Sequence, residues 1–113
     1  MNKRNTQVML QDEDKQVYID YYLTRKAQLI FRAINHTLRQ QLISAIDEHK
    51  ELTVTQLMAL LRLEQSIVSQ HLAILRKAGI VLSKKVSKNV FYKLRYEKLE
   101  DIMQTTKVLT GNN

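Results

Sequence analysis

Short polar side chains recur at helical spacing in the middle of this 113-residue chain, between residues 65 and 77. Val68, Leu72 and Leu75 lie three and four positions apart, which predicts a helix with one buried face. At about 100° of rotation per residue, the opposite face carries Ser66, Gln70, Ala73 and Lys77, with Ser69 on its flank. Small side chains allow close approach to DNA, and a glutamine amide can bond the edge of adenine twice. The pattern therefore predicts a base-reading helix, with an ordinary solvated face as the alternative.

A helix-turn-helix is predicted over residues 53–79, because Leu57, Leu60 and Leu61 also recur at helical spacing ahead of this helix. Thr53 and Gln56 stand three positions apart in the pattern of a capping box, so the earlier helix should begin near Val54. A connection of three residues separates the two helices. Gly79 can close the second helix by taking the left-handed conformation.

Residues 80–94 predict a β-hairpin, because β-branched and aliphatic runs flank a turn rich in lysine. Asn89 is expected to tolerate the left-handed conformation that a tight turn needs. Eight Lys or Arg and two Glu lie between Glu51 and Arg95, so 8 − 2 = +6 of the chain's net charge of +7 falls in this segment. Such a concentration indicates a phosphate-binding surface, with the hairpin as a wing beside the helix-turn-helix.

The predicted DNA-binding surface combines the recognition helix, the start of the helix before it and the wing. Its members carry hydroxyl, amide or cationic groups, which can bond base edges or phosphates. They are Thr53, Thr55, Gln65, Ser66, Ser69, Gln70, Arg76, Lys77, Lys84, Lys85, Lys88 and Asn89.

The stretch from about Phe31 to Leu94 resembles the ArsR/SmtB class of bacterial winged-helix transcription regulators. The most specific matching motifs are QSIVSQHL from position 65 and LRKAG from position 75, which form a long match without gaps. The motifs ELTVTQL from position 51 and VFYKL from position 90 also match. The resemblance implies a homodimeric repressor whose promoter affinity is often changed by a ligand, usually a metal ion.

The chain departs from this family where its metal-sensing members bind metal. Thr53-Val54-Thr55 stands in place of Cys-Val-Cys, the chain has no cysteine, and residues 96–109 contain no histidine. No metal site and no cofactor are therefore predicted. The family's Asp-Pro pair becomes His36-Thr37, which puts the turn at this point in doubt.

The three histidines have no spacing that places two of them on one helical face. His71 is expected to pack partly buried with one hydrogen bond, and His36 and His49 to lie on the surface. Adjacent carboxylates such as Glu100 and Asp101 diverge on a helix and do not form an acid–base pair. No catalytic or cofactor-binding residue is predicted, and the chain is not expected to be an enzyme.

Both ends of the chain carry apolar stripes that exceed what the winged motif can cover. Residues 17–34 are expected to form a helix with clustered tyrosines, and residues 96–109 repeat an apolar face. A homodimer through the terminal helices is therefore predicted, with completion of the monomer core as the alternative. The predicted interface residues are Tyr18, Tyr21, Tyr22, Leu99, Ile102 and Met103.

The predicted fold class is mainly α with a small β-hairpin, a winged helix-turn-helix dimerising through terminal helices. One domain, 1–113, is expected. Its parts are a flexible 1–12, N-terminal helices over 13–50, the helix-turn-helix over 53–79, the wing over 80–94 and a C-terminal helix over 96–109. Neither a signal peptide nor a membrane span is recognisable, so the protein is expected in the cytoplasm without a membrane partner.

The function predicted from these patterns is a sequence-specific regulator of transcription, a homodimeric repressor that binds double-stranded DNA. The alternative is a winged-helix module that binds proteins and not DNA; the polar recognition face and the basic segment argue against it. The sequence identifies neither the operator, the regulated genes nor an effector ligand.

Overall fold

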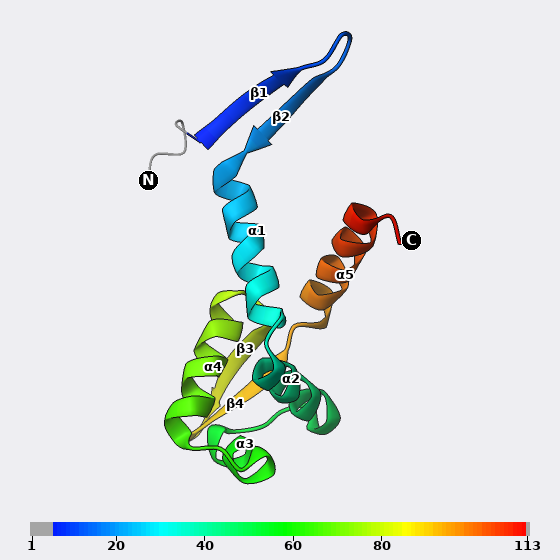
Figure 1. Cartoon of the computed structure of the whole chain (residues 1–113). Coiled ribbons are helices and arrows are strands. Elements are labelled where there is room, and N and C mark those ends of the chain that lie inside the picture. The colour runs from blue at the N-terminus through cyan, green and yellow to red at the C-terminus, as the bar shows by residue number, and fades with distance from the viewer. Residues whose placement is uncertain (1–5, 113) are drawn as a thin grey trace. The chain divides into compact units, whose positions relative to one another are not determined.

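The computed structural model describes residues 6–112 and divides the chain into two compact units, one up to Arg32 and one from Ala33 onward. The sequence predicts a single domain, and the division into two units differs from this prediction. The first unit contains a β-hairpin and most of helix α1. The second contains the remaining helices and a second β-hairpin, which are labelled in Figure 1.

The first unit begins with a β-hairpin, where the sequence predicts a flexible segment followed by helix. Strand β1 (Gln7–Gln11) pairs antiparallel with β2 (Gln16–Asp20). Residues 7–11 thus have regular structure, while the flexibility expected for residues 1–12 stays a prediction, and residues 1–5 lie outside the described residues. The expectation of helix is wrong for residues 16–20, because the short apolar runs pair with each other across a turn instead.

Helix α1 (Tyr21–Ile34) begins after the hairpin because Asp20 caps it. The Asp20 carboxylate accepts hydrogen bonds from the Tyr22 amide at 2.9 Å and from the Leu23 amide at 3.4 Å. Desolvation pushes the pKa of Asp20 upward, but bonds from the Gln7 side chain and these two amides outweigh it, so the pKa is lowered.

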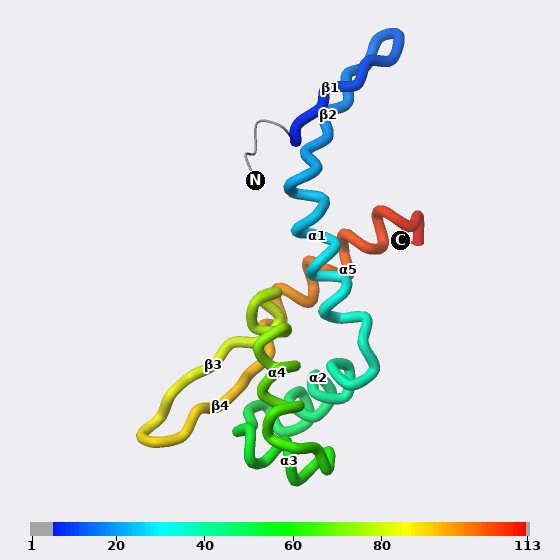
Figure 2. The backbone as a smooth tube through the Cα atoms, turned by 60° about the vertical axis from the view of Figure 1, so that its left-hand side comes forward, coloured from blue at the N-terminus to red at the C-terminus, as the bar shows by residue number. Residues whose placement is uncertain are grey.

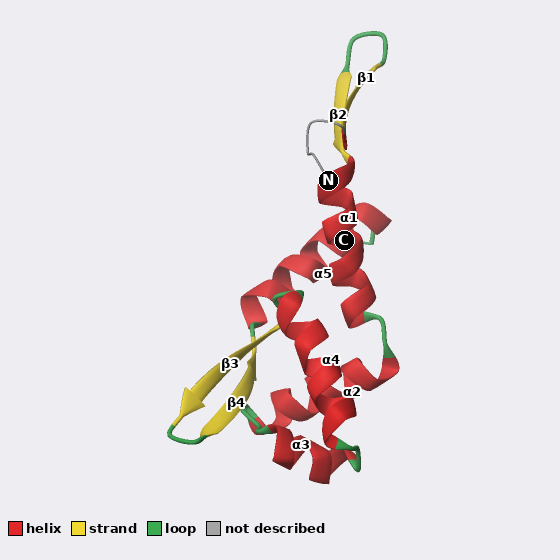
Figure 3. Ribbon diagram, turned by 90° about the vertical axis from the view of Figure 1, so that its left-hand side faces the viewer, coloured by secondary structure: helices red, strands yellow, loops and turns green. Residues whose placement is uncertain are grey.

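The second unit has the architecture of a winged helix-turn-helix, which confirms the predicted class of a mainly helical fold with a small β-hairpin. Its elements are α2 (Thr37–His49), α3 (Val54–Leu61), α4 (Gln65–Lys77), β3 (Val81–Val86), β4 (Asn89–Leu94) and α5 (Tyr96–Thr110). The hairpin of β3 and β4 projects as a wing from the group formed by α2, α3 and α4 (Figures 2 and 3). The core is aliphatic and lies between α2, α3, α4 and the base of the wing; its most buried side chains are Leu42, Ile46, Leu57, Val68, Leu72, Leu75, Ile80 and Val81.

Local signals set the ends of the two central helices. The predicted capping box is present, because the Gln56 amide donates to Thr53 Oγ1 at 3.2 Å and the Thr53 amide donates to Gln56 Oε1 at 2.9 Å. Arg62 closes α3 in the left-handed conformation, with φ of 55°. Gly79 follows α4 with φ of 78°, as the sequence predicts.

The turn of the wing differs from the expected one. Val86 pairs with Asn89, so two residues, Ser87 and Lys88, form the loop. Ser87 takes the left-handed conformation, with φ of 58°, and Asn89 lies in the strand. The expectation that Asn89 is the left-handed residue is therefore wrong, because the strand extends by one residue more than the turn pattern suggests.

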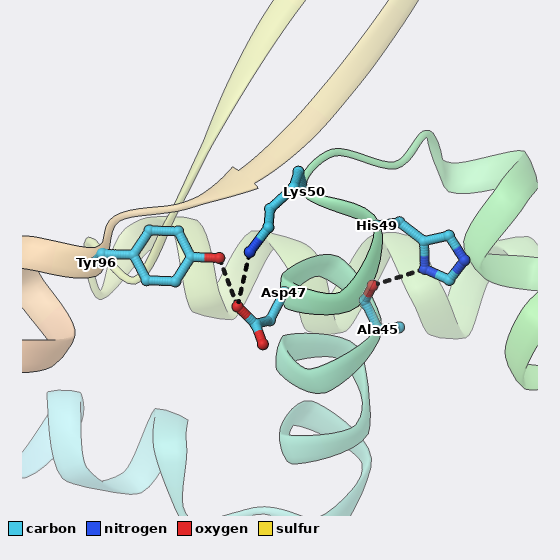
Figure 4. A network of polar contacts seen from close by, with 5 residues as sticks. All are labelled: Ala45, Asp47, His49, Lys50 and Tyr96. Carbon is cyan, nitrogen blue, oxygen red and sulfur yellow. Dashed lines mark hydrogen bonds and ion pairs between the residues drawn. The ribbon is translucent and has the colours of Figure 1, made fainter.

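A polar network connects α5 to the end of α2 (Figure 4). The Tyr96 hydroxyl donates to Asp47 Oδ1 at 2.6 Å, and Lys50 Nζ lies 3.6 Å from the same oxygen. The hydrogen bond from Tyr96 and the charge of Lys50 lower the pKa of Asp47, and the bond to Asp47 raises the pKa of Tyr96. This network links the first residue of α5 to the end of α2.

The aliphatic core should dominate the stability of the second unit, and two leucines of α3 test this. Leu57 is 0% exposed and Leu60 is 48% exposed. We expect Leu57→Ala to lower the free energy of unfolding by about 2–5 kcal/mol, because it leaves a cavity. Leu60→Ala is the matched control and should stay within about 0.5 kcal/mol. Urea unfolding followed by circular dichroism measures both, and equal losses of stability would contradict this core assignment.

Candidate nucleic-acid interface

Helix α4 divides into a buried and an exposed face. Val68, Leu72 and Leu75 are buried and pack into the core shared with α2 and α3. The side chains predicted to read bases point away from this core and are exposed; they are Gln65, Ser66, Ser69 and Gln70. The burial of the aliphatic stripe therefore presents the amide and hydroxyl groups to solvent, in the arrangement that a recognition helix needs.

The turn before α4 sets the angle at which it leaves α3. The left-handed Arg62 reverses the chain, and the Leu63 amide donates to the Met58 carbonyl at 3.1 Å. The side chain of Leu63 is half-buried in this turn. The amide of Val68 donates to the Glu64 carbonyl at 3.1 Å, which closes the first turn of α4.

The wing is anchored at its base and basic towards its tip. Leu52, just before α3, forms a bridge to Tyr92 of β4, with its amide donating to the Tyr92 carbonyl at 3.1 Å and the return bond at 2.8 Å. Helix α4 also packs against β3. The wing has four exposed lysines: Lys84, Lys85 and Lys93 in its strands and Lys88 in the turn itself. Their charges therefore extend beyond the helices that anchor the hairpin.

The other predicted DNA-binding residues take different positions. Arg76 and Lys77 are exposed in the last turn of α4, Asn89 is exposed at the start of β4, and Thr55 is exposed in the first turn of α3. Thr53 is half-buried, and its hydroxyl oxygen accepts the capping bond. Its part in the described fold is thus the cap of α3, and its contact with DNA stays a prediction.

Sequence reasoning misses a cluster that holds α4 against α2. Arg39 of α2 is only 6% exposed, its Nε donates to the Ala33 carbonyl at 2.6 Å, and its Nη1 lies 3.1 Å from His71 Nδ1. His71 is half-buried with this one bond, as predicted. Burial lowers the pKa of His71, and His36 and Arg39 lower it further by charge repulsion.

His36 is exposed, as expected, but it also caps α2. Its Nδ1 accepts a hydrogen bond from the Leu38 amide at 3.1 Å, and its ring centroid lies 4.9 Å from that of His71. The doubt about the turn at His36-Thr37 is resolved, because the imidazole replaces the usual short polar cap. A lone histidine before a helix is the only local signal of this cap.

The predicted dimer residues lie on three elements. Tyr18 is on β2, Tyr21 and Tyr22 are in α1, and the others are on α5. Tyr18, Tyr21 and Met103 are exposed, while Tyr22 and Leu99 are half-buried. Ile102 is 7% exposed in the single chain, so it is covered without a partner. Their place in an interface stays a prediction.

Metal-binding clusters and membrane spans are both absent from the described part of the chain. Residues 6–112 contain no group of three or more His, Cys, Asp or Glu side chains arranged to hold a metal ion. No helix there is long and apolar enough to cross a membrane.

Similarity to known proteins extends over most of the winged motif. Residues 37–83 match the model of the arsR family of bacterial regulatory proteins. The transcriptional repressor PagR of Bacillus anthracis is 31% identical over 87 residues, covering 76% of this chain and 86% of PagR. The transcriptional activator HlyU of Vibrio cholerae is 39% identical over 69 residues, covering 61% of this chain and 63% of HlyU.

The solved structures agree on the fold. The crystal structure of PagR superposes with a TM-score of 0.62 at 27% identity, covering 76% of this chain and 98% of PagR. An ArsR-like regulator from Rhodococcus, at 18% identity, has a TM-score of 0.71 over 80% of this chain and 84% of its own, and shows the likeness of the fold alone. With a relative as similar as PagR over most of its length, the chain belongs to the arsR family of bacterial regulatory proteins.

Proposed function

We propose that this protein is a sequence-specific DNA-binding regulator of transcription that places α4 in the major groove. The observation that carries the proposal is the exposed polar face of α4, opposite its buried aliphatic stripe and beside an anchored basic wing. Ser66 and Gln70 lie one helical turn apart on this face and are short enough to approach base edges. The wing lysines supply contacts to phosphates that do not depend on sequence.

We further propose that the protein acts as a homodimer and as a repressor. PagR is a repressor and is similar to this chain over most of its own length, whereas HlyU is an activator. The proposal that this protein represses transcription therefore rests on its similarity to PagR. Exposed Met103 and half-buried Leu99, one helical turn apart on α5, support a subunit interface. Two linked recognition helices would read two half-sites about one helical turn of DNA apart.

A base contact from Gln70 is the sharpest test of sequence reading. Gln70→Ala should weaken binding to a duplex selected from a random pool by about 1–3 kcal/mol, because it removes a base-edge hydrogen bond, and should hardly change binding to random duplex. Gln104→Ala, at an exposed glutamine of α5, is the matched control and should change neither. Fluorescence anisotropy measures both affinities, and equal values for Gln70→Ala and the parent would reject the base contact.

A phosphate contact from Lys88 should appear in the salt dependence. Lys88→Ala should weaken binding to selected and random duplex together, and should reduce the slope of log affinity against log salt by about 0.9 for each phosphate that this lysine neutralises. Lys15→Ala, at an exposed lysine between β1 and β2, is the control and should keep the parent slope. Absent or salt-insensitive binding by the parent protein would favour the protein-interaction module instead.

The subunit interface is tested on α5 by a charge at an exposed apolar position. Met103 is 50% exposed, so Met103→Glu should leave the monomer fold intact and shift the sedimenting species from dimer to monomer. Specific DNA affinity should fall with it, because the half-sites are no longer bound together. Thr105→Glu, about 200° further around the same helix, is the control. A dimer that persists in Met103→Glu would remove this face of α5 from the interface.

A further inference from the structure

Three basic side chains meet where the recognition helix packs on α2. Arg39 of α2 lies between the Ala33 carbonyl and His71 of α4, to which its Nη1 is 3.1 Å distant. The ring of His36, at the start of α2, lies 4.9 Å from the ring of His71, measured between centroids, with an angle of 43° between the planes. All of these residues belong to the second unit, so their arrangement is that of the winged motif itself.

The hydrogen bonds of this cluster require both imidazoles to be neutral. A guanidinium and a backbone amide can only donate, so His71 Nδ1 must accept from Arg39 and His36 Nδ1 must accept from the Leu38 amide. A proton on either Nδ1 breaks one of these bonds. It also adds a second positive charge beside the buried guanidinium of Arg39.

The remaining histidine behaves differently and provides a natural comparison. His49 is exposed, as expected, and its Nδ1 lies 3.1 Å from the carbonyl oxygen of Ala45 (Figure 4). A carbonyl can only accept, so this Nδ1 carries the hydrogen. A second proton on the His49 ring therefore goes to Nε2 and leaves the bond intact. Protonation breaks the His36 and His71 bonds but not this one.

We propose that His36, Arg39 and His71 form a proton-responsive positioning site for α4, at which protonation of His71 breaks its contact with Arg39, loosens α4 from α2 and lowers affinity for specific DNA. The regulation concerns the recognition helix and so rests on the proposed function. The charged and titratable groups that face His71 are His36, from the segment before α2, and Arg39, from α2. Neither can balance an added positive charge.

The direction of the pH effect follows from the lowered pKa of His71. Above the ordinary histidine pKa of about 6.5, the ring is neutral whether its contact with Arg39 is formed or broken, and the contact has its full strength. Below this pH the ring binds the proton more readily when the contact is broken, so the contact is progressively lost as the pH falls. The affinity for random-sequence duplex depends on the overall positive charge of the protein and should not fall in the same pH range.

The test measures affinity for a selected duplex and for random duplex between pH 7.5 and pH 5.5. We expect the specific affinity of the parent protein to fall by up to about tenfold, because pH 5.5 is one unit below the ordinary histidine pKa and a free imidazole there is about ten times more often protonated than neutral. His71→Asn keeps an acceptor for Arg39 but cannot titrate, so its affinity should not fall. His36→Asp keeps a cap for α2 and adds a counter-charge, and should also abolish the fall. His49→Asn is the matched control and should retain it.

Each outcome separates this inference from the proposed function. Absence of specific binding at pH 7.5 would reject the proposed function, and NMR titration of the three histidine rings, with the amide shifts of α2 and α4, would then decide the positioning site alone. Specific binding with the same pH profile in the parent and in His71→Asn would overturn the inference. Loss of the helical circular dichroism signal by pH 5.5 would also overturn it, because the proposal requires a folded winged motif.

Discussion

The burial of one face of α4 is the constraint on which the rest of this structure depends. Val68, Leu72 and Leu75 occupy the centre of an aliphatic core that α2, α3 and the base of the wing complete. Burial of this aliphatic core is the main favourable contribution to the free energy of folding of the unit. Because a helix can bury only one face in such a core, the same packing dictates that the amide and hydroxyl side chains face outward. Stability and the presentation of the recognition face therefore have one cause.

Polar contacts then refine a position that the aliphatic core leaves only approximate. The capping box at Thr53 fixes the start of α3, and the bridge between Leu52 and Tyr92 attaches the wing to the same segment. On the other side of α4, Arg39 connects the recognition helix to α2 through His71. These contacts are directional, whereas apolar packing is not, so they determine orientation more than stability. A regulator that reads bases needs this precision, because base-edge hydrogen bonds tolerate little displacement.

The first unit, unlike the second, has no aliphatic core of its own among its described residues. Its two strands pair Val8 with Ile19 and Leu10 with Val17, so one face of the hairpin is wholly apolar, and much of it is exposed. A two-stranded hairpin is at best marginally stable in water on its own. The Asp20 cap joins it to α1 by local bonds, and its acidic turn contrasts with the basic wing. The family features reside in the winged motif, not in this hairpin.

The sequence by itself determined the elements whose signals are local. Helical spacing of aliphatic residues, the Thr53 and Gln56 pair and Gly79 indicated α3, the turn and α4, because each depends on residues within a few positions. Only the tertiary structure decided the hairpin of residues 7–20, since short apolar runs fit helix or strand until a partner strand is known. It alone also placed Arg39 against His71, 32 positions apart, and so revealed the cluster. Contacts between distant residues depend on the complete packing of the chain, and no local pattern records them.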